Sequence, residues 1–131
     1  MLYRKIPKTG DALSILGFGL MRLPVTEEGR IDAPRAIRQI HDAIDQGINY
    51  LDTAWPYHTG ESENVLGRAL ADGYRDKVNI ATKLPSWMIK SREDMDTYLN
   101  AQLKNSRRIG STTTCSTRWP GRPGTSSKHS V

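Results

Sequence analysis

The sequence of 131 residues has one cysteine and lacks any long apolar run. A single cysteine cannot close an internal disulfide or ligate a structural metal, which excludes a disulfide-stabilised secreted scaffold. No segment approaches the roughly 18 apolar residues of a membrane span, and the first residues lack the apolar core of a signal peptide. We therefore expect a cytoplasmic protein with no metal site and no membrane partner.

Acidic residues are absent from the last 27 positions. That segment holds five of the 19 basic residues, while all 14 acidic residues precede it. Residues 1–104 therefore carry no net charge, so the body of the chain has no electrostatic basis for binding nucleic acid or a membrane surface. The basic tail could contact nucleic acid, but its aromatic residues do not alternate with arginines as stacking on single strands requires. We expect no nucleic-acid partner.

The same tail is poor in apolar residues. Eleven of the residues in 105–131 are Ser or Thr, and the sizeable apolar ones are Ile109, Trp119 and Val131. The tail has no period of 2 or 3.6 and cannot bury enough surface to offset chain entropy. We predict a boundary at about residue 104, with a folded body over 1–104 and a disordered, basic, Ser/Thr-rich tail over 105–131.

The body alternates between segments typical of strands and of helices. A turn-rich tetrad at 8–11 predicts a small hairpin between 2–6 and 12–15. Further apolar segments predict strands at 14–21, 48–52 and 78–83.

A helix is predicted after each of these three strands. Asp32 is a suitable N-cap with Pro34 in the first turn, and Gly47 ends the first helix. The second carries Val65 and Leu66 and closes near Gly73. The third opens at the capping-box sequence 91–94 and places apolar residues on one face, namely Met95, Tyr98, Leu99 and Leu103. This alternation predicts parallel strands with right-handed crossovers, an α/β fold.

Three polar residues follow the carboxyl ends of predicted strands, where ligands of such folds gather. Asp52 and Lys83 end successive strands, and Tyr57 lies in the loop after Asp52. Each alone is more simply a turn residue, a solvated lysine or a half-buried ring. Together they favour proton transfer, because an ammonium lowers the pKa of a nearby phenol and a carboxylate holds the ammonium in place. Such a phenol can protonate a carbonyl oxygen while a reduced nicotinamide delivers hydride to its carbon.

Several motifs closely resemble the aldo-keto reductase family. They are Leu-Gly-Phe-Gly-Leu-Met-Arg at 16–22, Leu-Asp-Thr-Ala-Trp-Pro-Tyr-His at 51–58, and the segments 60–63, 66–70 and 81–83. The resemblance covers roughly residues 2–104. Residues 55–58 and 83–87 look most like the microbial branch whose full-length members often carry a C-terminal iron–sulfur segment. We expect no such cluster in this chain.

The resemblance implies the N-terminal part of a (β/α)8 TIM barrel, a hairpin followed by about three βα units, with NADPH as the cofactor and a small carbonyl compound as the substrate. It implies Tyr57 as the proton donor, supported by Asp52 and Lys83. It also implies that Met21, Arg22 and Asp52 lie near the cofactor. The family's fourth catalytic residue, a His at the end of the fourth strand, has no counterpart.

The other histidines are not expected to replace it. His58 directly follows Tyr57 and does not match the missing residue, and His41 lies within the first predicted helix, where we expect a structural role.

The resemblance stops where the tail begins. Read in a shifted frame, codons for residues 110–119 permit Ile-Asp-Tyr-Tyr-Leu-Leu-His-Ala-Leu, which resembles the family's fourth strand with its His. We interpret the tail as the product of a frameshift or sequencing error; a genuine Ser/Thr-rich linker is the alternative. On this interpretation the chain has three of eight barrel strands, lacks the late phosphate-binding loops, and binds NADPH weakly or not at all.

The predicted function is that of an NADPH-dependent oxidoreductase of the aldo/keto reductase type, which reduces aldehydes or ketones to alcohols, in a truncated and inactive copy. The alternative is a non-catalytic remnant that acts as an interaction module through an exposed edge strand. The sequence predicts no particular oligomeric state.

Overall fold

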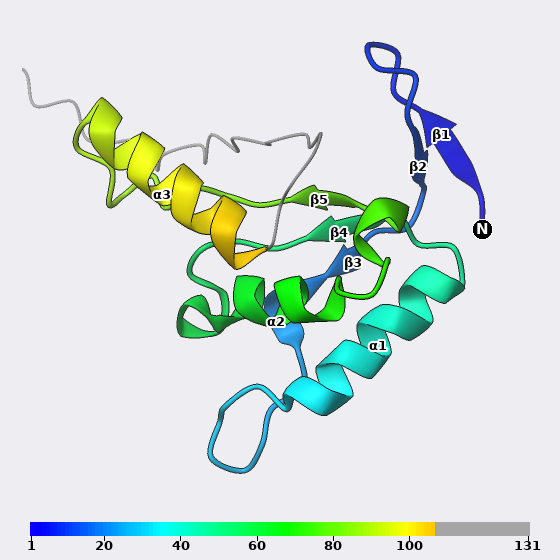
Figure 1. Cartoon of the computed structure of the whole chain (residues 1–131), viewed down its shortest axis with the longest axis horizontal. Coiled ribbons are helices and arrows are strands. Elements are labelled where there is room, and N and C mark those ends of the chain that lie inside the picture. Colours follow the sequence, from blue (N-terminus) through cyan, green and yellow to red (C-terminus); the bar gives the residue numbers. More distant parts are fainter. Residues whose placement is uncertain (107–131) are drawn as a thin grey trace, which may run out of the picture.

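A computed structural model describes residues 1–106. Its strands form two sheets (Figure 1). One is an antiparallel hairpin of β1 (Tyr3–Lys5) and β2 (Ala12–Ser14), and the other is a three-stranded parallel sheet with the order β3 (Phe18–Gly19), β4 (Tyr50–Asp52), β5 (Asn79–Ala81). The predicted hairpin and the parallel arrangement of the three later strands are therefore confirmed.

Residues 1–106 also form three α-helices and three short 3-10 helices. The α-helices are α1 (Ala33–Asp45), α2 (Glu61–Ala69) and α3 (Arg92–Asn105), and the 3-10 helices are η1 (Leu20–Arg22), η2 (Tyr57–Gly60) and η3 (Arg75–Lys77). Helix α2 contacts both α1 and α3, and Figure 1 shows it between them. Within residues 1–106 no helix is long and apolar enough to cross a membrane.

The helix starts follow their predicted caps. The Asp32 side chain accepts a hydrogen bond from the Arg35 N–H at 3.1 Å, which satisfies one of the donors left free at the start of α1. Before α3, Ser91 and Asp94 form a reciprocal capping box. The disordered tail was predicted over 105–131, but Asn105 belongs to α3 and Ser106 is the buried C-cap of that helix. Residues 107–131 lie outside the described part of the chain.

All three strands predicted for the parallel sheet are shorter than expected, and the one predicted at 48–52 pairs only over Tyr50–Asp52. In the segment 14–21 only Phe18–Gly19 pairs with β4, because the chain turns into η1 directly after Gly19 and buries Leu20 completely. In the segment 78–83 the ladder ends at Ala81, so Lys83 lies two residues beyond the strand. At 14–21 apolar composition was a poor guide to the strand end, because the buried turn residue Leu20 is apolar as well.

The predicted apolar face of the third helix is also partly wrong. Met95 is 45% exposed, and the buried residue of α3 is Gln102, which is 1% exposed. Within residues 1–106 this helix faces a polar cluster rather than a continuous apolar surface, as described for the site below.

The hydrophobic core lies between the parallel sheet and helices α1 and α2. Its fully buried large residues come from each of these elements and from η1: Leu20, Ile40, Leu51 and Leu66. Leu51 is the central residue of the central strand and pairs with Phe18 on one side and Ile80 on the other. The core therefore fixes the strand register that determines which residues emerge at the carboxyl edge.

Replacement of Leu66 by Ala should lower the free energy of unfolding by about 2–5 kcal/mol, because it leaves a cavity in this core. The matched change Leu16→Ala, at a side chain that is 57% exposed, should stay within about 0.5 kcal/mol. Urea unfolding followed by circular dichroism measures both values. Equal losses for the two variants would contradict this placement of the core.

Candidate active site

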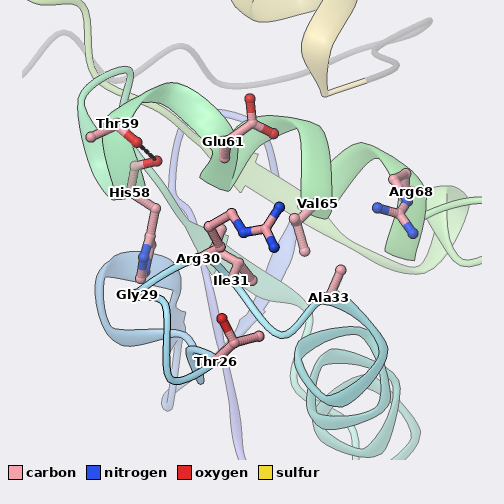
Figure 2. A pocket seen from close by; sticks show the side chains of 10 residues that line it. All are labelled: Thr26, Gly29, Arg30, Ile31, Ala33, His58, Thr59, Glu61, Val65 and Arg68. Carbon is pink, nitrogen blue, oxygen red and sulfur yellow. Dashed lines mark hydrogen bonds between the residues drawn. The ribbon is translucent and has the colours of Figure 1, made fainter.

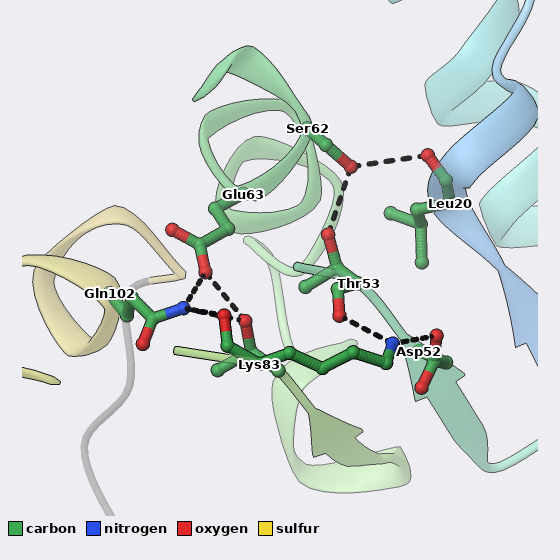
Figure 3. Close-up of polar contacts among 8 residues, drawn as sticks. Leu20, Asp52, Thr53, Ser62, Glu63, Lys83 and Gln102 are labelled. Atoms are coloured by element: carbon green, nitrogen blue, oxygen red, sulfur yellow. Dashed lines mark hydrogen bonds and ion pairs between the residues drawn. The ribbon is translucent and has the colours of Figure 1, made fainter. Parts of the chain in front are cut away.

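The structure brings Asp52, Lys83 and Tyr57 together at the carboxyl edge of the parallel sheet. The Lys83 Nζ donates to Asp52 Oδ1 at 2.5 Å and to the Thr53 carbonyl oxygen at 3.0 Å (Figure 3). It also lies 5.3 Å from the centre of the Tyr57 ring. Since β4 and β5 are parallel neighbours in which Asp52 pairs with Ala81, the residues that follow them emerge at the same edge.

The charge of Lys83 is stabilised by its neighbours. Partial burial pushes the pKa of the Lys83 ammonium down, but the hydrogen bond and the attraction to Asp52, with a smaller contribution from Tyr57, outweigh it and raise this pKa above its usual value. The side chains of Lys83 and Asp52 are 27% and 35% exposed, so solvent screens the pair only in part. Lys83 is therefore charged at neutral pH and can stabilise negative charge on the oxygen of a neighbouring phenol.

A pocket of about 700 Å³ opens beside this group. Tyr57 and Lys83 share it with the apolar side chains of Met21, Leu84 and Trp87. Met21, Arg22 and Asp52 were predicted to lie near a cofactor. Met21 lines the same cavity as Tyr57. Arg22 and Asp52 are not among the lining residues, and Asp52 reaches the pocket through Lys83. Trp87, which is 68% exposed, belongs to the 83–87 motif but was not predicted as a site residue.

A buried polar cluster of Glu63, Thr82 and Gln102 lies next to the backbone of Lys83, and it was not predicted from the sequence. The Glu63 side chain, 1% exposed, accepts from Thr82 Oγ1 at 2.6 Å and from Gln102 Nε2 at 2.8 Å (Figure 3). Gln102 Nε2 also lies 3.1 Å from the Lys83 carbonyl oxygen. The cluster thus connects α2 and α3 to the backbone of Lys83. Its sequence signal is that Glu63 lies three residues before Leu66, on the apolar face of α2.

A second buried contact connects the site to η1. The hydroxyl groups of Thr53 and Ser62 are 2.9 Å apart, and Ser62 Oγ donates to the Leu20 carbonyl oxygen at 3.2 Å (Figure 3). Thr53 and Ser62 are both fully buried. These bonds therefore hold three segments against one another: Thr53 after β4, the start of α2, and η1, which carries Met21.

The two histidines among residues 1–106 have different surroundings. His41 Nε2 is 2.7 Å from the Ala69 carbonyl oxygen, and its ring stacks on Tyr74 with the centroids 3.9 Å apart. It thus joins α1 to the end of α2, as expected for a structural role. His58 contacts the Leu23 amide. Among residues 1–106 no group of three His, Cys, Asp or Glu residues is placed to hold a metal ion.

Comparisons with known proteins point to one family. The family model of the aldo/keto reductase family matches residues 15–111. The aldo-keto reductase YhdN of Bacillus subtilis is 40% identical over 84 residues, which are 63% of this chain and 25% of that protein. The 6-dehydroglucose reductase of Novosphingobium aromaticivorans is 37% identical over 89 residues, 62% of this chain and 28% of that protein.

A solved structure is similar as well. The holo form of an aldo-keto reductase from Bacillus halodurans has a TM-score of 0.66 and 28% identity, over 82% of this chain and 37% of that one. The chain thus spans about a quarter of the length of the curated relatives that it matches.

Replacement of Lys83 by Met should destabilise the fold at neutral pH, because Asp52 loses its partner. The pKa of Lys83 is raised in the folded protein, so the stabilising contribution of the ammonium is complete below the ordinary lysine pKa of about 10.4. It is lost as the pH rises through the higher folded value. The difference in unfolding free energy between wild type and variant should therefore be largest near neutral pH and shrink above about pH 10.4.

The control for this prediction is Lys77→Met. Lys77 lies 3.8 Å from Asp45 with its side chain 54% exposed, and removal of such a pair should change stability by about 1 kcal/mol or less. Urea unfolding across the alkaline range measures both variants. A Lys83→Met effect that grows with pH would contradict the account.

Proposed function

Because this chain belongs to the aldo/keto reductase family, we propose that its site takes part in the reduction of small aldehydes or ketones to alcohols, with NADPH as the hydride donor. The described parallel strands and helices form the N-terminal part of a (β/α)8 barrel. The observation that carries the proposal is the phenol of Tyr57 beside the Lys83 ammonium, which is itself paired with Asp52.

In the proposed reaction Tyr57 donates its hydroxyl proton to the carbonyl oxygen while hydride reaches the carbonyl carbon. The carbonyl group becomes an alcohol, and Tyr57 is left as a phenolate. Lys83 stabilises that phenolate through its charge, and Asp52 together with the Thr53 carbonyl oxygen holds the ammonium in place. Solvent then returns a proton to Tyr57, which completes the balance of protons.

The residues around the pocket fit a nicotinamide cofactor. Met21, Leu84 and Trp87 provide apolar walls, against which a flat ring can pack next to Tyr57 and Lys83. NADPH supplies the hydride when it is bound. The cofactor contacts of Met21, Arg22 and Asp52 stay predictions, and Met21 has the most direct support because it lines the cavity.

The described residues supply the proton-donor side of such a site. In (β/α)8 barrels a phosphate site is frequently formed after strands seven and eight, whereas residues 1–106 contain three parallel strands. We therefore still predict that the 131-residue polypeptide binds NADPH weakly or not at all. We also predict that it is inactive by itself. A test of Tyr57 needs these residues in a complete barrel.

Transfer of residues 15–104 into the corresponding segment of the Bacillus subtilis relative provides that test. We expect the chimera to reduce a generic aldehyde with NADPH, and Tyr57→Phe to lower kcat by about 10²–10⁴, the usual contribution of a positioned proton donor. Oxidation of NADPH followed by absorbance measures the rate.

The matched control is Tyr98→Phe. Tyr98 contacts Trp55 through its ring, with the centroids 5.1 Å apart, and Phe keeps that ring. The control should stay within about threefold of the unmodified chimera, since no proton donor is lost. If the chimera folds and binds NADPH, and Tyr57→Phe is as active as Tyr98→Phe, the proposed role of Tyr57 is wrong.

A further inference from the structure

The turn directly after Tyr57 has an unusual backbone. His58 and Thr59 have φ values of 52° and 55°, in the left-handed region, and Gly60 follows with φ of 94°. Residues with a Cβ are uncommon there, and each costs on the order of 1–2 kcal/mol. Two such residues in succession persist only where surrounding contacts hold them.

Besides the local bond from the Thr59 hydroxyl to the His58 carbonyl oxygen at 2.6 Å, one contact connects this turn to the chain segment that carries Met21. The Leu23 N–H donates to His58 Nε2 at 3.1 Å. Figure 2 shows the imidazole reaching from the turn before α2 toward the loop that leads to α1. Leu23 directly follows η1, and Leu20 at the other end of η1 accepts from Ser62. The segment after Tyr57 thus holds η1 at both ends.

We propose that His58 is a positioning residue, whose imidazole fixes the Tyr57 turn against η1 so that Tyr57 and Met21 face the same pocket. An imidazole nitrogen that accepts from an N–H carries no proton. The neutral ring must therefore carry its proton on Nδ1, and the structure assigns this tautomer to His58. The consequence for carbonyl reduction rests on the proposed function, whereas the hydrogen bond and the tautomer do not.

A purely local explanation would be that a His stands at position 58 because it tolerates the left-handed backbone of the turn. Two variants separate this from positioning. Asn adopts the left-handed region more readily than most residues, but its side chain is one atom too short to replace Nε2. Gln places an acceptor oxygen as many bonds from the backbone as Nε2, without relieving the backbone. His58→Asn therefore removes the contact but keeps a residue type that tolerates the left-handed region, while His58→Gln keeps the contact with a residue type that tolerates it less.

The test is nuclear magnetic resonance of the ¹⁵N-labelled 131-residue chain at neutral pH. Two-bond ¹H–¹⁵N spectra should show the proton of His58 on Nδ1. In His58→Asn the Leu23 amide should exchange with solvent about tenfold faster, as expected for one lost hydrogen bond, and the Tyr57 ring signals should shift. His58→Gln should restore both, although the stability of His58→Asn should equal or exceed that of His58→Gln.

Each of these readouts can overturn the proposal. Three results would each contradict it: a proton on Nε2 of His58, an unchanged exchange rate of the Leu23 amide in His58→Asn, or Tyr57 ring signals that do not shift in His58→Asn. None of the measurements needs turnover or bound NADPH, so failure of the positioning role is distinguishable from failure of the proposed function.

Discussion

The ion pair of Lys83 and Asp52 is the interaction around which this part of the molecule is arranged. It forms because two adjacent parallel strands end at the same edge and deliver an ammonium and a carboxylate 2.5 Å apart. Partial burial alone would disfavour the ammonium, and the carboxylate reverses that effect. The fold thus keeps a cation beside the Tyr57 ring at neutral pH, and the proposed chemistry depends on that charge.

Polar contacts in the interior hold the elements that surround this pair. Glu63 and Gln102 connect α2 and α3 to the backbone next to Lys83, while Ser62 connects α2 to η1. A buried polar group that loses its partner costs about 1–3 kcal/mol, so these contacts restrict how the helices can dock. The turn at His58 belongs to the same scheme, because it joins the loop of Tyr57 to the far end of η1.

Local and topological features could be predicted from the sequence. The caps at Asp32 and Ser91 are encoded by adjacent residues, and the convergence of Asp52 and Lys83 follows from parallel pairing alone. The strand ends, the buried Glu63 cluster and the contact between His58 and Leu23 could not. Each depends on residues from 19 to 39 positions apart whose side chains show no shared pattern. The catalytic and cofactor roles stay predictions.

In the proposed chemistry Lys83 acts on the reaction through the phenol of Tyr57. A double-mutant cycle of Tyr57→Phe and Lys83→Met on the aldehyde reduction rate of the chimeric barrel tests it most directly. If Lys83 works through Tyr57, the double variant should be no more than about twofold slower than Tyr57→Phe alone, because the second change removes support for a group already lost. Fully additive losses would show that the two residues act independently, and would contradict the account.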